Sequence, residues 1–137
     1  MRDVLIVGAG PAGLMAAIAA ARQAASVLVL EAGPAPGRKL LASGGGRCNL
    51  TNTLPNHEFV ARFGRDGRFM GPALAGLDGA MLRAFMDDIG VATHAPDGRR
   101  VFPVDHRADT VLRGLLAALD DLGVELRTDT TVDALLL

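Results

Sequence analysis

A glycine-rich turn near the amino terminus constrains the fold more than any other feature of this sequence. The apolar run Val4–Val7 leads into Gly8–Gly13 (GAGPAG), which opens an alanine-rich run. A second apolar run, Val27–Leu30, follows and ends on Glu31. Apolar runs on either side of a small-residue helix are typical of a strand, a tight turn, a helix and a second strand. This order predicts a βαβ unit and an α/β fold with parallel strands.

The glycines of this turn have separate roles. Gly8 suits the sharp change from strand to helix, Gly10 has no side chain to block a phosphate, and Gly13 lets the helix approach the strand. Pro11 suits the first helical turn, where its missing N–H costs no hydrogen bond. The free N–H groups and the positive end of the helix dipole would then face the phosphates of a dinucleotide.

Glu31 stands 18 residues beyond Gly13, at the end of the second predicted strand. A carboxylate there accepts hydrogen bonds from both ribose hydroxyls and repels a 2′-phosphate, which predicts FAD or NAD rather than NADP. The alternatives are an ordinary glycine turn and a solvated acid at a strand end. Because strand, turn, helix, second strand and acid follow in register, we favour the dinucleotide interpretation.

Length and charge exclude several classes of protein. The 137 residues suit one domain, residues 1–137, and the net charge of −1 indicates neither nucleic acid nor an anionic membrane as a partner. The single cysteine excludes an internal disulfide, which fits a reducing compartment. The chain enters a strand at once, leaving no room for a signal peptide, and no apolar run approaches the roughly 20 residues of a membrane span. We therefore expect a soluble, cytoplasmic protein.

The segment 33–53 changes abruptly to glycine, arginine, serine and asparagine. Arg38 and Lys39 offer positive charge to phosphate, the run Ser43–Gly46 can present backbone N–H groups, and Asn49 supplies both a donor and an acceptor. A flexible linker is the alternative interpretation. Linkers rarely carry so many directional groups, so we favour a loop that wraps a polyanion.

Two motifs in this segment carry a resemblance to a known family. Gly37–Leu40 (GRKL) and Ser43–Asn52 (SGGGRCNLTN) resemble the hallmark of the BaiN/YhiN-type family of NAD(P)/FAD-dependent oxidoreductases. The later Val101–Pro103 is also similar, and the resemblance extends over essentially the whole chain. Asp105 stands where the family pattern suggests serine, which puts any hydroxyl role at that position in doubt.

The resemblance implies the amino-terminal part of a Rossmann-like FAD-binding domain, three-layered with a mostly parallel sheet and incomplete at its C-terminus. Family members are longer and carry a substrate-side domain that we expect to be absent from this chain. The diphosphate would lie at the glycine turn, and the loop from Arg38 to Asn49 near the phosphates and flavin. In flavoproteins of this type the backbone near a position like Val132 meets the adenine. The predicted cofactor-binding residues are Gly8, Gly10, Pro11, Ala12, Gly13, Glu31, Ala32, Arg38, Lys39, Ser43, Gly44, Gly45, Gly46, Asn49 and Val132.

The implied activity is that of a flavin-dependent oxidoreductase. Full-length relatives would reduce FAD with NAD(P)H and pass hydride to a small organic acceptor, such as an activated carbon–carbon double bond. No pair of titratable residues qualifies as acid and base, so no catalytic residue is predicted. The alternative is a non-catalytic dinucleotide-binding module or an inactive fragment. An NAD-binding subunit is disfavoured because residues 38–52 supply more charged and hydrogen-bonding groups than NAD binding requires. The sequence does not predict the oligomeric state.

The remaining chemically active side chains have simpler interpretations. Cys48 follows Arg47, which favours a thiolate, but no second cysteine exists for exchange, so packing is favoured over redox chemistry. His57, His94 and His106 are interpreted as structural or surface residues. No spacing of ligands predicts a metal site.

The first helix is predicted from Pro11 to Gln23. Ala24-Ala25 stand where a glycine usually takes the left-handed cap position, so we expect another geometry at this corner. Residues 54–77 show no sustained period and predict short helical turns and loops.

Asp78 predicts the N-cap of another helix that ends before Gly90. Its predicted buried stripe is Met81, Leu82, Phe85, Met86 and Ile89. Strands at 91–94 and 99–102 predict a hairpin, in which the two arginines at 99 and 100 end a solvated strand or contact a nicotinamide phosphate. A helix over 108–122, a strand over 124–127 and the segment 130–136 return the chain to the first parallel sheet.

Overall fold

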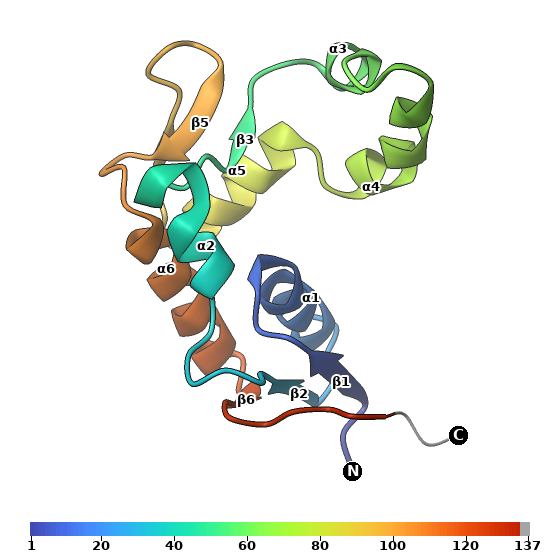
Figure 1. Cartoon of the computed structure of the whole chain (residues 1–137), viewed down its shortest axis with the longest axis vertical. Helices are drawn as coiled ribbons and strands as arrows, with labels where there is room; N and C mark the ends of the chain where they lie inside the picture. Colours follow the sequence, from blue (N-terminus) through green and yellow to red (C-terminus); the bar gives the residue numbers. More distant parts are fainter. Residues whose placement is uncertain (135–137) are drawn as a thin grey trace.

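The computed structural model describes residues 1–134 and places a parallel sheet at one end and an antiparallel sheet at the other (Figure 1). The parallel sheet contains β1 (Val4–Val7), β2 (Val27–Leu30) and β6 (Glu125–Arg127) in the order β1-β2-β6. Both pairings are parallel. The predicted Rossmann-like α/β fold is confirmed, and so is the return of the chain to its first sheet.

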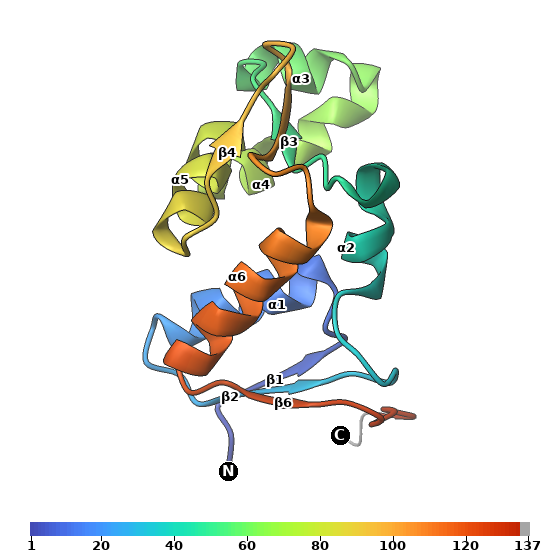
Figure 2. The same ribbon diagram turned by 90° about the vertical axis from the view of Figure 1, so that its left-hand side faces the viewer.

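Two helices, α1 (Pro11–Ala21) and α6 (Ala108–Asp121), cover one face of the parallel sheet (Figure 2). Both helices present apolar residues at helical spacing, and burying these residues is the main source of stability here. The buried residues of the two helices and of β2 are Leu14, Ala17, Ile18, Val27, Val29, Ala108, Val111, Leu112, Leu115, Ala118 and Leu119. On the other face Leu5 and Val7 are 50% and 59% exposed. Residues 1–134 therefore contain two of the three predicted layers, namely the parallel sheet and the layer of helices α1 and α6.

The antiparallel sheet contains β3 (Thr51–Asn52), β5 (Arg100–Pro103) and β4 (Thr93–His94) in that order, which confirms the hairpin. Helix α5 (Gly79–Asp88) precedes β4 and contacts this sheet. Its N-cap is the side chain of Asp78, as predicted, which accepts a hydrogen bond from a backbone N–H of the first turn at 2.8 Å.

One residue of the predicted α5 stripe was placed wrongly. Met81 is 47% exposed, whereas Met86 is buried and Leu82, Phe85 and Ile89 are half-buried. The buried residues follow the spacing i, i+3, i+4 and i+7 from Leu82, and Met81 lies about 100° before that stripe.

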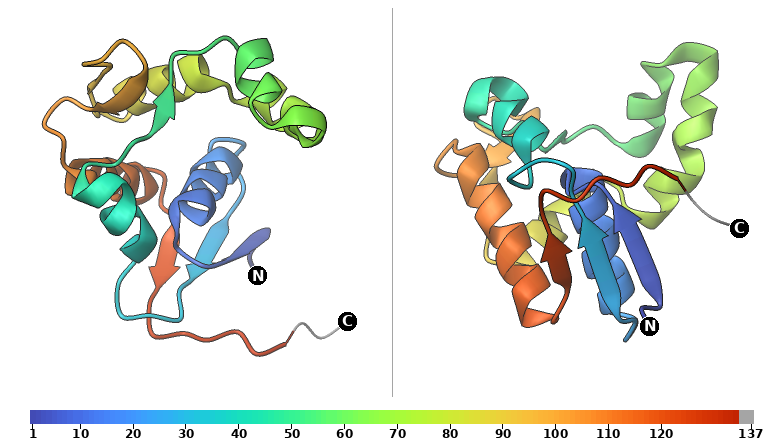
Figure 3. Two further views of the ribbon diagram at one scale, coloured as in Figure 1. Left: turned by 45° about the horizontal axis from the view of Figure 1, so that its top comes forward. Right: turned by 60° about the horizontal axis from the view of Figure 1, so that its bottom comes forward.

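Between the two sheets the chain forms α2 (Arg38–Ala42) and a 3₁₀ turn η1 (Ser43–Gly46). After β3 it forms α3 (Asn56–Ala61), the 3₁₀ segment η2 (Gly64–Met70) and α4 (Gly71–Gly76). We call residues 54–77 the arm, because they project from the rest of the molecule (Figure 3). The short turns predicted for this segment are confirmed.

The end of α1 differs from the prediction. The helix stops at Ala21 rather than Gln23, and Ala24 has a φ of +61°. The N–H of Ala24 donates to the carbonyl of Ala21, and that of Ala25 to the carbonyl of Ala20, at 2.9 and 3.4 Å. This is the left-handed cap that we expected alanine to avoid, and it costs about 1 kcal/mol. The reversal into β2 requires it.

The carboxyl-terminal part also differs in detail. Residues 130–134 form no strand, and Leu135 and Leu136, the end of the predicted segment, lie outside the described residues. Across the described range, 1–134, no helix is both long enough and apolar enough to span a membrane.

Candidate dinucleotide-binding site

The glycine turn brings the start of α1 against the end of β1. Gly8 has a φ of +98°, and its N–H donates to the carbonyl of Leu30 at 2.7 Å. A Cβ on Gly13 would lie 1.9 Å from the carbonyl oxygen of Gly8, so only glycine permits this approach. A Cβ on Gly10, by contrast, would meet no atom within 4 Å. Gly10 is the N-cap and Pro11 opens the helix, so the helix end is open to a phosphate.

Glu31 joins the glycine turn to the next loop. One carboxylate oxygen, Oε2, accepts a hydrogen bond from the N–H of Ala9 at 2.8 Å, and Oε1 accepts one from the N–H of Gly33 at 2.9 Å. These two bonds, first that from Gly33 and then that from Ala9, lower the pKa of Glu31, and the nearby charge of Arg38 adds to the effect. Each oxygen keeps a second acceptor position, which suits hydroxyl groups of a ribose.

The lowered pKa predicts how stability depends on pH through Glu31. Because the folded pKa lies below the ordinary value of 4.5, the carboxylate contributes stability above that value and loses it as the pH falls through the folded pKa. Glu31→Gln should therefore be less stable than the unchanged protein at neutral pH, since one amide N–H would then face an NH₂ group. Below both pKa values the difference should shrink towards zero, because protonated Glu and Gln are similar. Urea unfolding at several pH values measures this difference, and a constant gap would contradict the assignment.

A groove of about 580 Å³ runs from the glycine turn along α2. This volume lies in the range usual for small-molecule sites. Five residues predicted to bind the cofactor line it together, namely Gly8, Gly10, Glu31, Arg38 and Lys39. Ala9, Ala35, Gly37 and Ala42 also line the groove and were not predicted. The only sequence feature that could have indicated these four residues is their small size in a segment rich in glycine and proline.

Ten other predicted residues do not line this groove. Pro11, Ala12 and Gly13 lie in the first turn of α1, beside it. Ala32 is exposed next to Glu31. Val132 is half-buried in the last described segment, whose neighbours Asp129 and Thr130 hydrogen-bond through their N–H groups to the carbonyls of Gly33 and Glu31. The remaining five are Ser43, Gly44, Gly45, Gly46 and Asn49.

Gly37 holds α2 against the glycine turn. Its φ is +73°, and its N–H donates to the carbonyl of Ala9 at 2.9 Å. A Cβ there would lie 2.5 Å from the Cδ1 of Leu112 on α6. The backbone of the groove is therefore fixed on one side by Glu31 and on the other by α6.

The 3₁₀ turn η1 beyond the groove is formed by glycines with positive φ. Gly44, Gly45 and Gly46 have φ of +57°, +66° and +83°, a conformation that other residues rarely adopt. The hydroxyl of Ser43 donates to the carbonyl of Leu40 at 2.7 Å. With its amide oriented to satisfy both groups, Asn49 donates to the carbonyls of Val101 and Thr51. Asn49 therefore ties this loop to the antiparallel sheet.

Cys48 packs in the core rather than facing the loop surface. Its side chain is 2% exposed, and burial raises the pKa of its thiol although a hydrogen bond with Ser43 opposes this. A buried thiol with a raised pKa is a poor nucleophile. The structure supports the packing interpretation.

Two histidines treated separately in the sequence lie together. The Nε2 atoms of His94 and His106 are 2.9 Å apart, and His106 has a φ of +55°.

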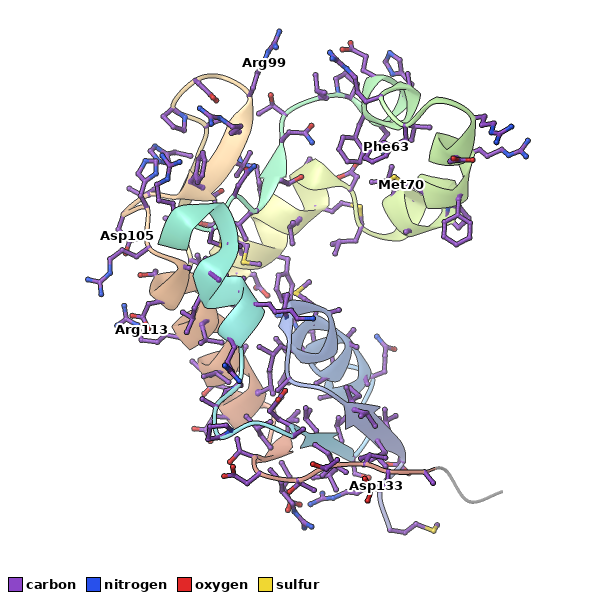
Figure 4. The ribbon with its side chains drawn as sticks, viewed as in Figure 1. Phe63, Met70, Arg99, Asp105, Arg113 and Asp133 are labelled. Atoms are coloured by element: carbon purple, nitrogen blue, oxygen red, sulfur yellow. The ribbon has the colours of Figure 1, made fainter. Side chains whose placement is uncertain are left out.

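The adjacent Asp105 (Figure 4) accepts hydrogen bonds from the N–H of Arg107 and the hydroxyl of Thr110, so it stabilises the start of α6. In the part of the chain that the structure describes, no three His, Cys, Asp or Glu side chains are grouped to hold a metal ion.

Parallel strands, a glycine turn opening into a helix, and an acid bonded to that turn define a Rossmann-type dinucleotide-binding domain. The chain belongs to the HI0933-like protein Rossmann domain family, whose profile matches residues 2–136. The family resemblance inferred from the Gly37–Leu40 and Ser43–Asn52 motifs is confirmed.

Named relatives resemble the chain in sequence, and a solved structure resembles it in fold. The chain is 34% identical over 137 residues to a 3-dehydro-bile acid delta(4,6)-reductase of Clostridium scindens, covering 98% of this chain and 33% of that protein. It is 32% identical over 124 residues to a ribosomal RNA dihydrouridine synthase of Haemophilus influenzae, covering 89% and 30%. The fold matches a 3-ketosteroid-delta4-(5alpha)-dehydrogenase of Rhodococcus jostii with a TM-score of 0.70 and 19% identity, over 93% of this chain and 38% of that one. The chain thus spans about a third of the length of these curated relatives.

Proposed function

We propose that this domain binds FAD and belongs to an oxidoreductase that takes hydride from NAD(P)H and adds it to a carbon–carbon double bond conjugated to a carbonyl group. The observation that carries the proposal is the open end of α1. Gly10 leaves space at the helix N-terminus, and Glu31 fixes the turn beside it while keeping free acceptor positions. A diphosphate and a ribose fit these two positions chemically.

The chain beyond the groove favours FAD over NAD. Arg38 and Lys39 line the groove and supply charge for the diphosphate. The Ser43–Asn49 loop then continues to the antiparallel sheet and offers backbone groups for a further ring system. When bound, FAD supplies the hydride chemistry, while the protein orients it and excludes water.

The names of the two relatives support the choice of acceptor. A delta(4,6)-reductase of a 3-dehydro-bile acid saturates a ring double bond of a substrate with a 3-oxo group, and a dihydrouridine synthase makes the saturated form of uridine. Both acceptors contain a double bond conjugated to a carbonyl. We propose the same reaction type here, with a small organic acceptor. Hydride adds to the carbon distant from the carbonyl, and a proton to the carbon next to it.

The proposal is tested with purified protein in three steps. FAD titration should produce flavin absorption that stays with the protein through gel filtration. Anaerobic NADH or NADPH should bleach this absorption, and a cyclic enone should restore it. Uridine within RNA, tested in parallel, distinguishes a nucleic-acid acceptor. Failure to take up FAD would overturn the proposal, whereas FAD binding without reduction by either nicotinamide would support the non-catalytic module.

A further inference from the structure

A second pocket lies between the arm and the antiparallel sheet, away from the dinucleotide groove. It has a volume of about 290 Å³ and is lined by Asn52, Leu54, Phe59, Arg62, Phe63 and Arg99. Phe63 lies on the arm and Arg99 on the hairpin (Figure 4). The proposed flavin chemistry uses none of these side chains.

Much of the pocket wall is apolar. The rings of Phe59 and Phe63 pack edge to face, with centroids 5.3 Å apart and planes at 66°. Leu54 also lines the pocket, and its N–H donates to the side-chain oxygen of Asn52 at 2.9 Å. Such a wall suits a flat apolar body, because aromatic faces and edges contact rings favourably.

Both charged residues of the pocket are arginines. Among residues 1–134, neither Arg62 nor Arg99 forms an ion pair, although Glu58 lies one helical turn before Arg62. Asp97, the carboxylate nearest to Arg99 along the hairpin, is bound instead by the side chain of Arg100 at 2.6 Å and by the N–H groups of residues 99 and 100. Both arginines line the pocket, and neither is paired with a carboxylate within the described residues.

We infer that this pocket binds an organic anion with a flat apolar body, such as a fused-ring carboxylate or sulfonate. The apolar body packs against Phe59 and Phe63, and the acidic group accepts hydrogen bonds from Arg62 and Arg99, whose planar forks match such groups. The β3 strand links the pocket to the Ser43–Asn49 loop within a few residues. That the bound anion is also the hydrogen acceptor rests on the function proposed above, but the binding itself does not.

The test uses the full chain and the fluorescent probe anilinonaphthalene sulfonate, with phenylnaphthylamine as the uncharged comparison. The sulfonate should bind more tightly than the neutral probe, and added salt should weaken only the sulfonate. The double variant Arg62→Gln with Arg99→Gln should weaken sulfonate binding about tenfold and leave the neutral probe unchanged. Arg65→Gln with Arg68→Gln removes the same total charge from the protein at two arm residues that do not line the pocket, and should have little effect. Arg62→Lys with Arg99→Lys should restore part of the affinity.

Three results would overturn the inference. Equal loss of affinity in the two glutamine pairs would mean that general charge, not the pocket, attracts the probe. Equal affinity for both probes would remove the role of the arginines. Binding of a short uridine-rich RNA through Arg62 and Arg99, without binding of the sulfonate, would assign the surface to nucleic acid. None of these measurements needs FAD, so their failure is distinguishable from failure of the flavin reaction.

Discussion

Replacing Gly13 with alanine should strongly destabilise this domain. The added Cβ would lie 1.9 Å from the carbonyl oxygen of Gly8 and 3.1 Å from its carbon. Both atoms belong to the backbone at the end of β1, so neither can rotate away, and helix and strand must separate. We expect a loss of at least about 3 kcal/mol in the free energy of unfolding, a large share of what a domain has. Urea unfolding followed by circular dichroism measures the loss.

Gly76→Ala is the matched control for this prediction. Gly76 ends α4 on the arm, its φ is not positive, and a Cβ there would meet no atom within 4 Å. The same substitution should therefore change the free energy of unfolding by less than about 1 kcal/mol. If both alanine variants unfolded at the same urea concentration, the close approach of α1 to β1 would be wrong.

Replacing Gly10 with valine should leave the domain folded and remove FAD binding. Gly10 has φ of −76° and ψ of 176°, which any residue adopts, and the position around its Cβ is empty to 4 Å. A valine side chain would occupy the space that a diphosphate needs at the helix N-terminus. We expect the affinity for FAD to fall more than about 100-fold, equivalent to about 2.8 kcal/mol.

Two measurements on the Gly10→Val variant separate binding from folding. Quenching of flavin fluorescence gives the affinity, and urea unfolding without FAD should match the unchanged protein. Normal FAD binding by this variant would place the diphosphate elsewhere and would refute the function proposed here. Loss of folding would instead show that the open space at Gly10 is needed by the protein itself.

Local signals explain what could be predicted from the sequence. The glycine turn, the cap at Asp78 and the left-handed Gly90 after α5 each depend on a few neighbouring residues. Strand and helix bounds were accordingly correct within one or two residues in most elements. The exception at Ala24 arose because the path into β2 outweighs a local cost of about 1 kcal/mol.

Contacts between distant segments could not be predicted in the same way. The groove includes Ala9, Ala35 and Ala42, whose side chains carry no chemical signal, and they meet there only after α2 packs on α6. The pairing of His94 with His106 depends on the hairpin and on a left-handed residue after it. The hydrogen bonds from the Asn49 amide to the carbonyls of Thr51 and Val101 likewise depend on the pairing of β3 with β5. Predicting these features requires knowing how segments that are distant in the sequence pack in the folded domain.

The position of β1 affects how this protein must be handled at the bench. Within residues 1–134 this strand has a hydrogen-bonded neighbour on one side only, and the exposed Leu5 and Val7 lie on it. An exposed edge strand with apolar side chains can pair with further strands, including those of a second molecule, and this pairing promotes aggregation. Binding to this domain should therefore be measured in dilute samples. Light scattering across a concentration series shows where aggregation begins.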